Sequence, residues 1–160
     1  MNTQKGTTLI EVLIALFIVA IGVLGHAKMQ MKSMDVAQQA SFSQVANTAL
    51  LDLSQRMRAN ADLASDFVVT NLANGNDIAA NVDCSAAVCT NAQFAQSELA
   101  EWFNHLQNNL PSPRFSVEQS TDLYTLTLIW DTAQSGTGTA GCVMANDDSY
   151  KCGSMEVWIP

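Results

Sequence analysis

An uninterrupted apolar stretch near the N-terminus constrains this chain more than any other feature. The 21 residues from Thr7 to Ala27 contain one formal charge, that of Glu11. As an α-helix they would be about 30 Å long, at roughly 1.5 Å per residue, which matches the hydrocarbon core of a bilayer. The stretch therefore predicts a membrane-spanning helix that carries one carboxylate.

The residues before this stretch differ from those of a secretory signal peptide. Such a signal has a basic region, a shorter apolar core and a small-residue cleavage site behind the core. Here Lys5 is the only basic residue before the core, and the small residue, Gly6, precedes it. The segment Lys-Gly-Thr-Thr-Leu-Ile-Glu, followed by unbroken apolar sequence, resembles the class III signal of type IV pilins and pseudopilins.

This resemblance implies roles for three residues. A prepilin peptidase would cut between Gly6 and Thr7 on the cytoplasmic side and leave the apolar helix on the mature protein. Thr7 would be the site of N-methylation, although it stands where the family usually has phenylalanine. Glu11 would pair with the new terminal amine of a neighbouring subunit as that subunit leaves the membrane for a filament.

The residues themselves also single out Glu11. A carboxylate at the bilayer centre costs about 3 kcal/mol on insertion scales, and such residues usually serve a function. The alternative is an interfacial position, because after cleavage Glu11 would lie only about 6 Å above the new terminus. Cleavage would nevertheless create a cation in the same layer.

Two glycines, Gly22 and Gly25, interrupt the apolar helix. Each costs about 1 kcal/mol relative to alanine in an ordinary helix. They either allow close packing against a neighbouring helix or loosen the helix inside a filament.

The apolar pattern, together with the leader that the resemblance implies, divides the chain into four segments. Residues 1–6 form a leader, 7–27 the membrane or filament-core half of a long helix, 28–59 its amphipathic half, and 60–160 a globular head. Lys28, Lys32 and Asp35 mark the exit from the bilayer. The amphipathic half carries one apolar stripe at helical spacing, made of Phe42, Val45, Ala46, Ala49, Leu50, Leu53 and Met57.

The head pattern predicts a helix followed by strands, and the resemblance implies the α+β fold of type IV pilins, in which the long helix packs on an antiparallel sheet. Residues 60–83 have at most short structure, and 84–90 form a loop. A helical stripe runs from Ala95 to Leu110 and ends at Pro111. Strand patterns follow at 114–119, 123–130 and 154–159, with a loop at 120–122.

Charge and cysteines limit the function classes. From Asp62 onward there are twelve acidic residues and only two basic residues, Arg114 and Lys151, so the head repels nucleic acid.

The four cysteines favour two local disulfides among three possible connectivities, Cys84 with Cys89 and Cys142 with Cys152, and their spacing argues against zinc. Residues 146–149 are a weak calcium candidate, and His26 and His105 stand alone. The sequence holds no catalytic motif, so we expect neither a cofactor nor an enzyme.

Further segments resemble one subgroup, the PilV minor pilins: Ile21-Gly-Val-Leu-Gly25, Gln55-Arg-Met-Arg-Ala-Asn60, the Cys-containing segment before a helix with tryptophan and Leu110-Pro111, and Tyr124-Thr-Leu-Thr-Leu-Ile-Trp130. The resemblance implies a subunit that primes pilus assembly near the tip. It implies an inner-membrane location with a periplasmic head, then the extracellular pilus. The implied partners are other minor pilins, the major pilin, the assembly platform and a tip adhesin. A type II secretion pseudopilin and a non-polymerising anchored binding module are the alternatives.

Overall fold

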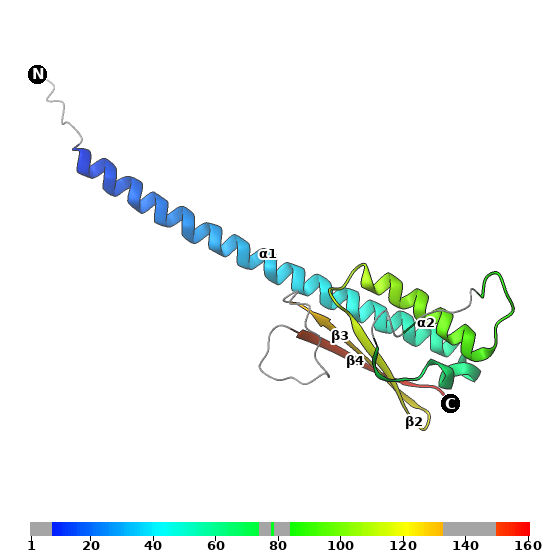
Figure 1. Ribbon diagram of the computed structural model, residues 1–160. Helices are drawn as coiled ribbons and strands as arrows, with labels where there is room; N and C mark the ends of the chain where they lie inside the picture. The colour runs from blue at the N-terminus through cyan, green and yellow to red at the C-terminus, as the bar shows by residue number, and fades with distance from the viewer. Residues whose placement is uncertain (1–7, 74–77, 79–83, 133–149) are drawn as a thin grey trace, which may run out of the picture. The chain divides into compact units, whose positions relative to one another are not determined.

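The computed structural model describes residues 8–73, 78, 84–132 and 150–160 (Figure 1). Contacts divide the chain into two compact units, Met1–Ala40 and Ser41–Pro160, and the first helix contributes to both. We call the second the globular unit. The elements in chain order are helix α1 (Leu9–Ala59), 3-10 helix η1 (Ala61–Phe67), strand β1 (Val69–Ala73), helix α2 (Asn91–Gln107), and strands β2 (Arg114–Ser120), β3 (Leu123–Asp131) and β4 (Tyr150–Trp158).

The four described strands form one antiparallel sheet in the order β1-β2-β3-β4. Strands β2 and β3 form a hairpin in which Ser120 pairs with Leu123, so its loop has two residues rather than the predicted three. Thr121 in this loop has a φ of 57°, the left-handed conformation that tight hairpins require. The antiparallel sheet and the long N-terminal helix confirm the predicted α+β, pilin-like fold.

The core of the globular unit lies between the sheet and the helices. From α1 it takes Ala46, Leu50, Leu53 and Met57, each at most 2 % exposed, which confirms the predicted stripe. From β3 it takes the alternate residues Tyr124, Leu126, Leu128 and Trp130. Gly153 of β4 lets α1 approach closely, because a Cβ there would meet Leu50 Cδ1 at 3.3 Å.

Polar contacts fix α2 beside the second half of α1. The Trp102 indole Nε1 donates to the Ala49 carbonyl oxygen at 3.0 Å. Arg56 donates to Glu98 Oε2 at 2.7 Å and to Asp52 Oδ2 at 3.1 Å. Burial lowers the pKa of Arg56, but the hydrogen bonds and charges of these two carboxylates outweigh it, so the pKa lies above its ordinary value. The guanidinium therefore stays charged where the two helices meet.

Helix α2 and strand β4 have other boundaries than predicted, whereas the region 60–83 has the short structure expected of it. Helix α2 ends at Gln107 rather than Leu110, yet Leu110 is 3 % exposed, so the apolar stripe continues into the following turn. Strand β4 begins at Tyr150 rather than at residue 154, because residues 150–153 extend the ladder with β3 despite an unfavourable glycine. The region 60–83 contains η1 and the short edge strand β1, whose pairing with β2 is irregular.

Candidate assembly element

The first turn of α1 gives Glu11 a local partner. The Thr8 backbone N–H donates to Glu11 Oε2 at 3.1 Å, and the Glu11 N–H donates to the Thr8 carbonyl oxygen at 3.0 Å. Because the first amides of a helix lack partners within the helix, a carboxylate there satisfies one of them and interacts favourably with the helix dipole. The sequence prediction missed this role of Thr8. The Thr-x-x-Glu spacing of a capping box was the available signal.

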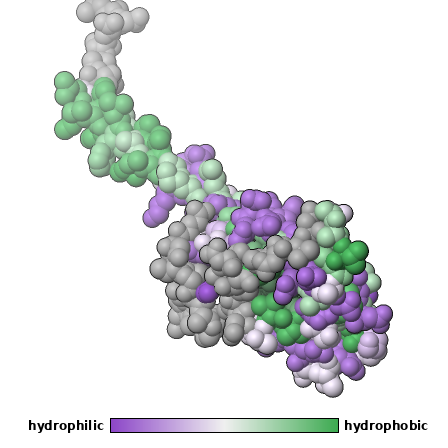
Figure 2. Space-filling view, turned by 45° about the vertical axis from the view of Figure 1, so that its right-hand side comes forward, coloured by the Kyte–Doolittle hydropathy of each residue, from purple (hydrophilic) through white to green (hydrophobic). Residues whose placement is uncertain are grey.

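An apolar surface follows this turn on every side of the helix. Twelve large apolar side chains between Leu9 and Leu24 are 48–78 % exposed. Figure 2 shows the green, hydrophobic colouring of this part of α1. Within the described residues, α1 alone is long and apolar enough to cross a membrane. We call residues 9–24 the apolar segment; so much exposed apolar surface requires lipid or other helices around it.

Gly22 lies near the end of the apolar segment of α1, and Gly25 directly follows this segment. A Cβ built at either position would have no atom within 4 Å. Contacts inside this chain therefore do not require glycine there. Close packing at these positions would have to be with another molecule.

Polar side-chain pairs mark the end of the apolar region on α1. The side chains of His26 and Gln30 are hydrogen-bonded at 3.1 Å, and Lys32 Nζ lies 3.3 Å from Asp35 Oδ2. These i, i+4 and i, i+3 neighbours stand where the sequence places the exit from the bilayer.

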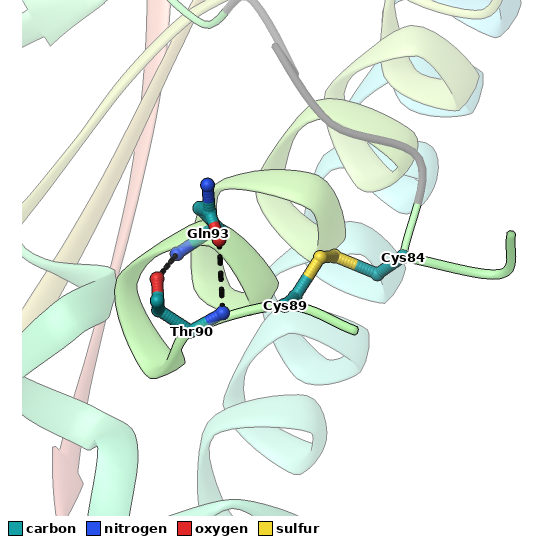
Figure 3. Close-up of a disulfide and its surroundings, with 4 residues drawn as sticks. All are labelled: Cys84, Cys89, Thr90 and Gln93. Carbon is teal, nitrogen blue, oxygen red and sulfur yellow. Dashed lines mark hydrogen bonds between the residues drawn. A yellow bond between two sulfur atoms is a disulfide. The ribbon is translucent and has the colours of Figure 1, made fainter. Parts of the chain in front are cut away.

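The disulfide Cys84–Cys89 closes a small loop directly before α2 (Figure 3). The next residue, Thr90, caps the helix: Gln93 N–H donates to Thr90 Oγ1 at 3.3 Å, and Thr90 N–H donates to Gln93 Oε1 at 2.9 Å. This disulfide confirms one of the predicted pairs. Cys152 is also disulfide-bonded, whereas Cys142 lies outside the described residues.

The remaining predicted positions either lie outside the described residues or form no site within them. Gly6, Thr7 and the calcium candidate 146–149 lie outside the described residues. His105 is exposed on the last turn of α2, where its carbonyl oxygen accepts from Asn109 Nδ2 at 2.8 Å. In the part of the chain that the structure describes, no three histidine, cysteine or acidic residues gather as a metal site.

Comparison with known families gives one match, the prokaryotic N-terminal methylation motif, over residues 1–25. None of the curated proteins and none of the solved structures compared with the chain matched it. The motif is that of prepilins, which are non-enzymatic and which prepilin peptidase processes for the pilus machinery. It covers Gly6, Thr7 and Glu11, and the long helix and antiparallel sheet follow it. The chain thus carries the N-terminal methylation motif of prepilins ahead of a pilin-like α+β fold, and in both respects it is a type IV pilin/pseudopilin-like protein.

Proposed function

We propose that this protein is a minor pilin that helps to prime assembly of a type IV pilus and is incorporated into it near the tip. The observation that carries the proposal is the prepilin motif at the start of a helix with an exposed apolar segment. Lipid surrounds residues 7–27 before assembly, and neighbouring helices surround them afterwards. Residues 28–59 and the head, 60–160, then lie outside the bilayer.

Processing prepares the first turn for assembly. Cleavage between Gly6 and Thr7 frees an α-amino group one residue before Thr8, whose amide contacts Glu11. The Glu11 carboxylate then pairs with the amine of a neighbouring subunit, and each charge neutralises the other as the subunit enters the filament. N-methylation at Thr7 modifies this amine, and Gly22 with Gly25 admits a neighbouring helix to the α1 backbone.

Two variants of Glu11 separate its charge from its capping role. Glu11→Gln removes the charge but keeps an oxygen that can accept from the Thr8 N–H, whereas Glu11→Ala removes both. We expect both variants to insert into the inner membrane and both to be recovered poorly in sheared pili. Asp35→Asn, an acidic residue beyond the apolar segment, is the matched control and should be incorporated normally. Normal incorporation of Glu11→Gln would contradict the pairing.

The minor-pilin assignment is tested against its rivals by deleting the gene. A minor pilin predicts loss or reduction of surface pili, restored by the wild-type gene and not by Glu11→Gln. Unchanged piliation with failed export of secreted proteins would assign the chain to type II secretion. A protein with an intact leader that stays in the inner membrane would be an anchored binding module.

A further inference from the structure

One of the three tryptophans is exposed on the surface of the globular unit. Trp102 and Trp130 are each 3 % exposed, whereas the Trp158 side chain at the end of β4 is 61 % exposed. Its cross-strand partner is Leu123, which is 36 % exposed. Cross-strand contact with leucine stabilises the sheet, but it leaves most of the indole in water. Tryptophan is highly buried on average in soluble proteins, and it is enriched among the interface residues that contribute most of the binding energy.

The register of the sheet places this pair on the face opposite the helices. The next residues along β3 and β4, Tyr124 and Val157, are paired with each other and belong to the core. Since neighbouring side chains on a strand point to opposite faces, Leu123 and Trp158 share the outer face. At the other end of this face Ile129 is only 2 % exposed, so among the described residues of β3 and β4 the exposed large apolar side chains of this face, Leu123 and Trp158, lie at one end.

Three carboxylates surround the exposed pair. Thr125 lies two residues after Leu123 on the same face of β3. Its two cross-strand partners are Glu118 and Glu156, and both are exposed. Asp122 is exposed in the hairpin loop directly before Leu123. The face therefore combines an aromatic ring with a negative field.

The positive side chains of the sheet lie far from this end. Arg114 pairs with Ile129 and Lys151 with Trp130, six and seven residues from Leu123 along β3. At about 3.3 Å per residue the separation is roughly 20 Å, well beyond the screening length of about 8 Å at physiological salt. A second copy of this acidic surface would be repelled, so charge complementarity favours a different, basic protein.

We propose that Trp158, Leu123, Glu118, Asp122 and Glu156 form a docking surface for a basic segment of another protein. An arginine or lysine of that segment lies against the indole face of Trp158, and neighbouring basic residues pair with the three carboxylates. The surface belongs to the globular unit, so the inference goes beyond the role proposed for the apolar segment.

Titration of the full-length protein in non-ionic detergent with a labelled tetra-arginine amide tests this surface. Fluorescence anisotropy should show saturable binding that weakens as NaCl is raised from about 50 to 200 mM. Trp158→Ala should weaken binding about tenfold, and Trp158→Phe less. Glu156→Gln should weaken it about threefold.

Matched controls lie on the helices, on the other side of the sheet. Leu51→Ala removes an apolar side chain that is 49 % exposed on α1, and Glu101→Gln removes an exposed carboxylate on α2. Both should bind the peptide like the wild type. Lack of binding, or equal binding by Trp158→Ala, would overturn the proposal. So would Trp158-dependent binding of neutral chitohexaose without binding of the peptide, since that result would assign the ring to a carbohydrate.

Discussion

The two parts of α1 have the same secondary structure and opposite surroundings. In the apolar segment, large apolar side chains point to every side and none is buried. Between Ser41 and Ala59, one stripe is buried under the sheet and α2, while polar residues occupy the other faces. A single helix thus carries one part whose apolar surface is covered within the chain and one part whose apolar surface is exposed and needs lipid or other helices around it.

This difference indicates that the distribution of apolar side chains around α1, rather than its helical conformation, determines which part of the helix packs into the globular unit. An apolar stripe along one side of a helix can be covered by one layer of protein. A helix that is apolar all round cannot be covered by a single neighbour. We therefore expect substitutions in residues 41–59 to change folding of the globular unit, and substitutions in the apolar segment to change assembly alone.

The largest expected difference is between two leucines of α1. Leu53 is 1 % exposed and Leu24 is 70 % exposed. Leu53→Ala should lower the free energy of unfolding of the globular unit by about 2–5 kcal/mol, because it leaves a cavity in the core. Leu24→Ala should change it by less than about 0.5 kcal/mol. Urea unfolding in non-ionic detergent, followed by tryptophan fluorescence, measures both; equal losses would contradict the separation.

Removal of the Cys84–Cys89 disulfide should have the next largest effect. The double variant with serine at both positions should lower the free energy of unfolding by about 2 kcal/mol, because the disulfide restricts the unfolded chain over a short loop. Membrane insertion of the variant should match that of the wild type. Val88→Ala, within the loop, is the control for a side chain that is fully exposed. A variant as stable as the wild type would show that this loop does not support the globular unit.

Periodicity predicted the long helix, α2 and the β2–β3 hairpin, and the pairing of the cysteines along the sequence predicted the local disulfide. The strongest signals were those in which apolar side chains face one layer, as in the stripe ending at Met57. Strand β1 gave a weak signal because it is an edge strand with irregular pairing. The early start of β4 depends on its partner β3, since Gly153 is a poor strand former whose role is to admit Leu50.

The candidate site was predicted to a different degree. Glu11 was conspicuous because it is the lone charge in an apolar stretch, whereas its contact with Thr8 depends on where the helix starts. The exposed Trp158 could not be told from a core residue, because alternation shows which residues share a face and not which face is covered.

A smaller comparison concerns the residues that precede the two helices. Thr90 caps α2 inside the globular unit, and Thr8 precedes α1 at the apolar segment. Thr90→Ala should lower the free energy of unfolding of the globular unit by about 1 kcal/mol, since it leaves the Gln93 amide without its acceptor. Thr8→Ala should leave it unchanged. Urea midpoints of the two variants, compared with the wild type, check this. A shift with Thr8→Ala would show that the first turn of α1 contributes to the stability of the globular unit.

The smallest expected effect is the coupling of charged pairs. Arg56 and Glu98 are about one-quarter exposed and 2.7 Å apart, whereas Lys32 and Asp35 are 72 % and 53 % exposed. A double-mutant cycle with Arg56→Gln and Glu98→Gln should give about 0.5–1 kcal/mol, decreasing with salt. The cycle with Lys32→Gln and Asp35→Asn should give no measurable coupling in unfolding. Coupling of equal size in both pairs would contradict the comparison.

The N-terminus of the chain in surface filaments tests the central claim most directly. Pili are sheared from cells, purified and digested, and the terminal peptide of this protein is sequenced by mass spectrometry. If the apolar segment waits in the membrane and then enters a filament, the filament fraction contains the chain beginning at Thr7. Recovery of the chain only from the inner membrane, with residues 1–6 still attached, would contradict the account.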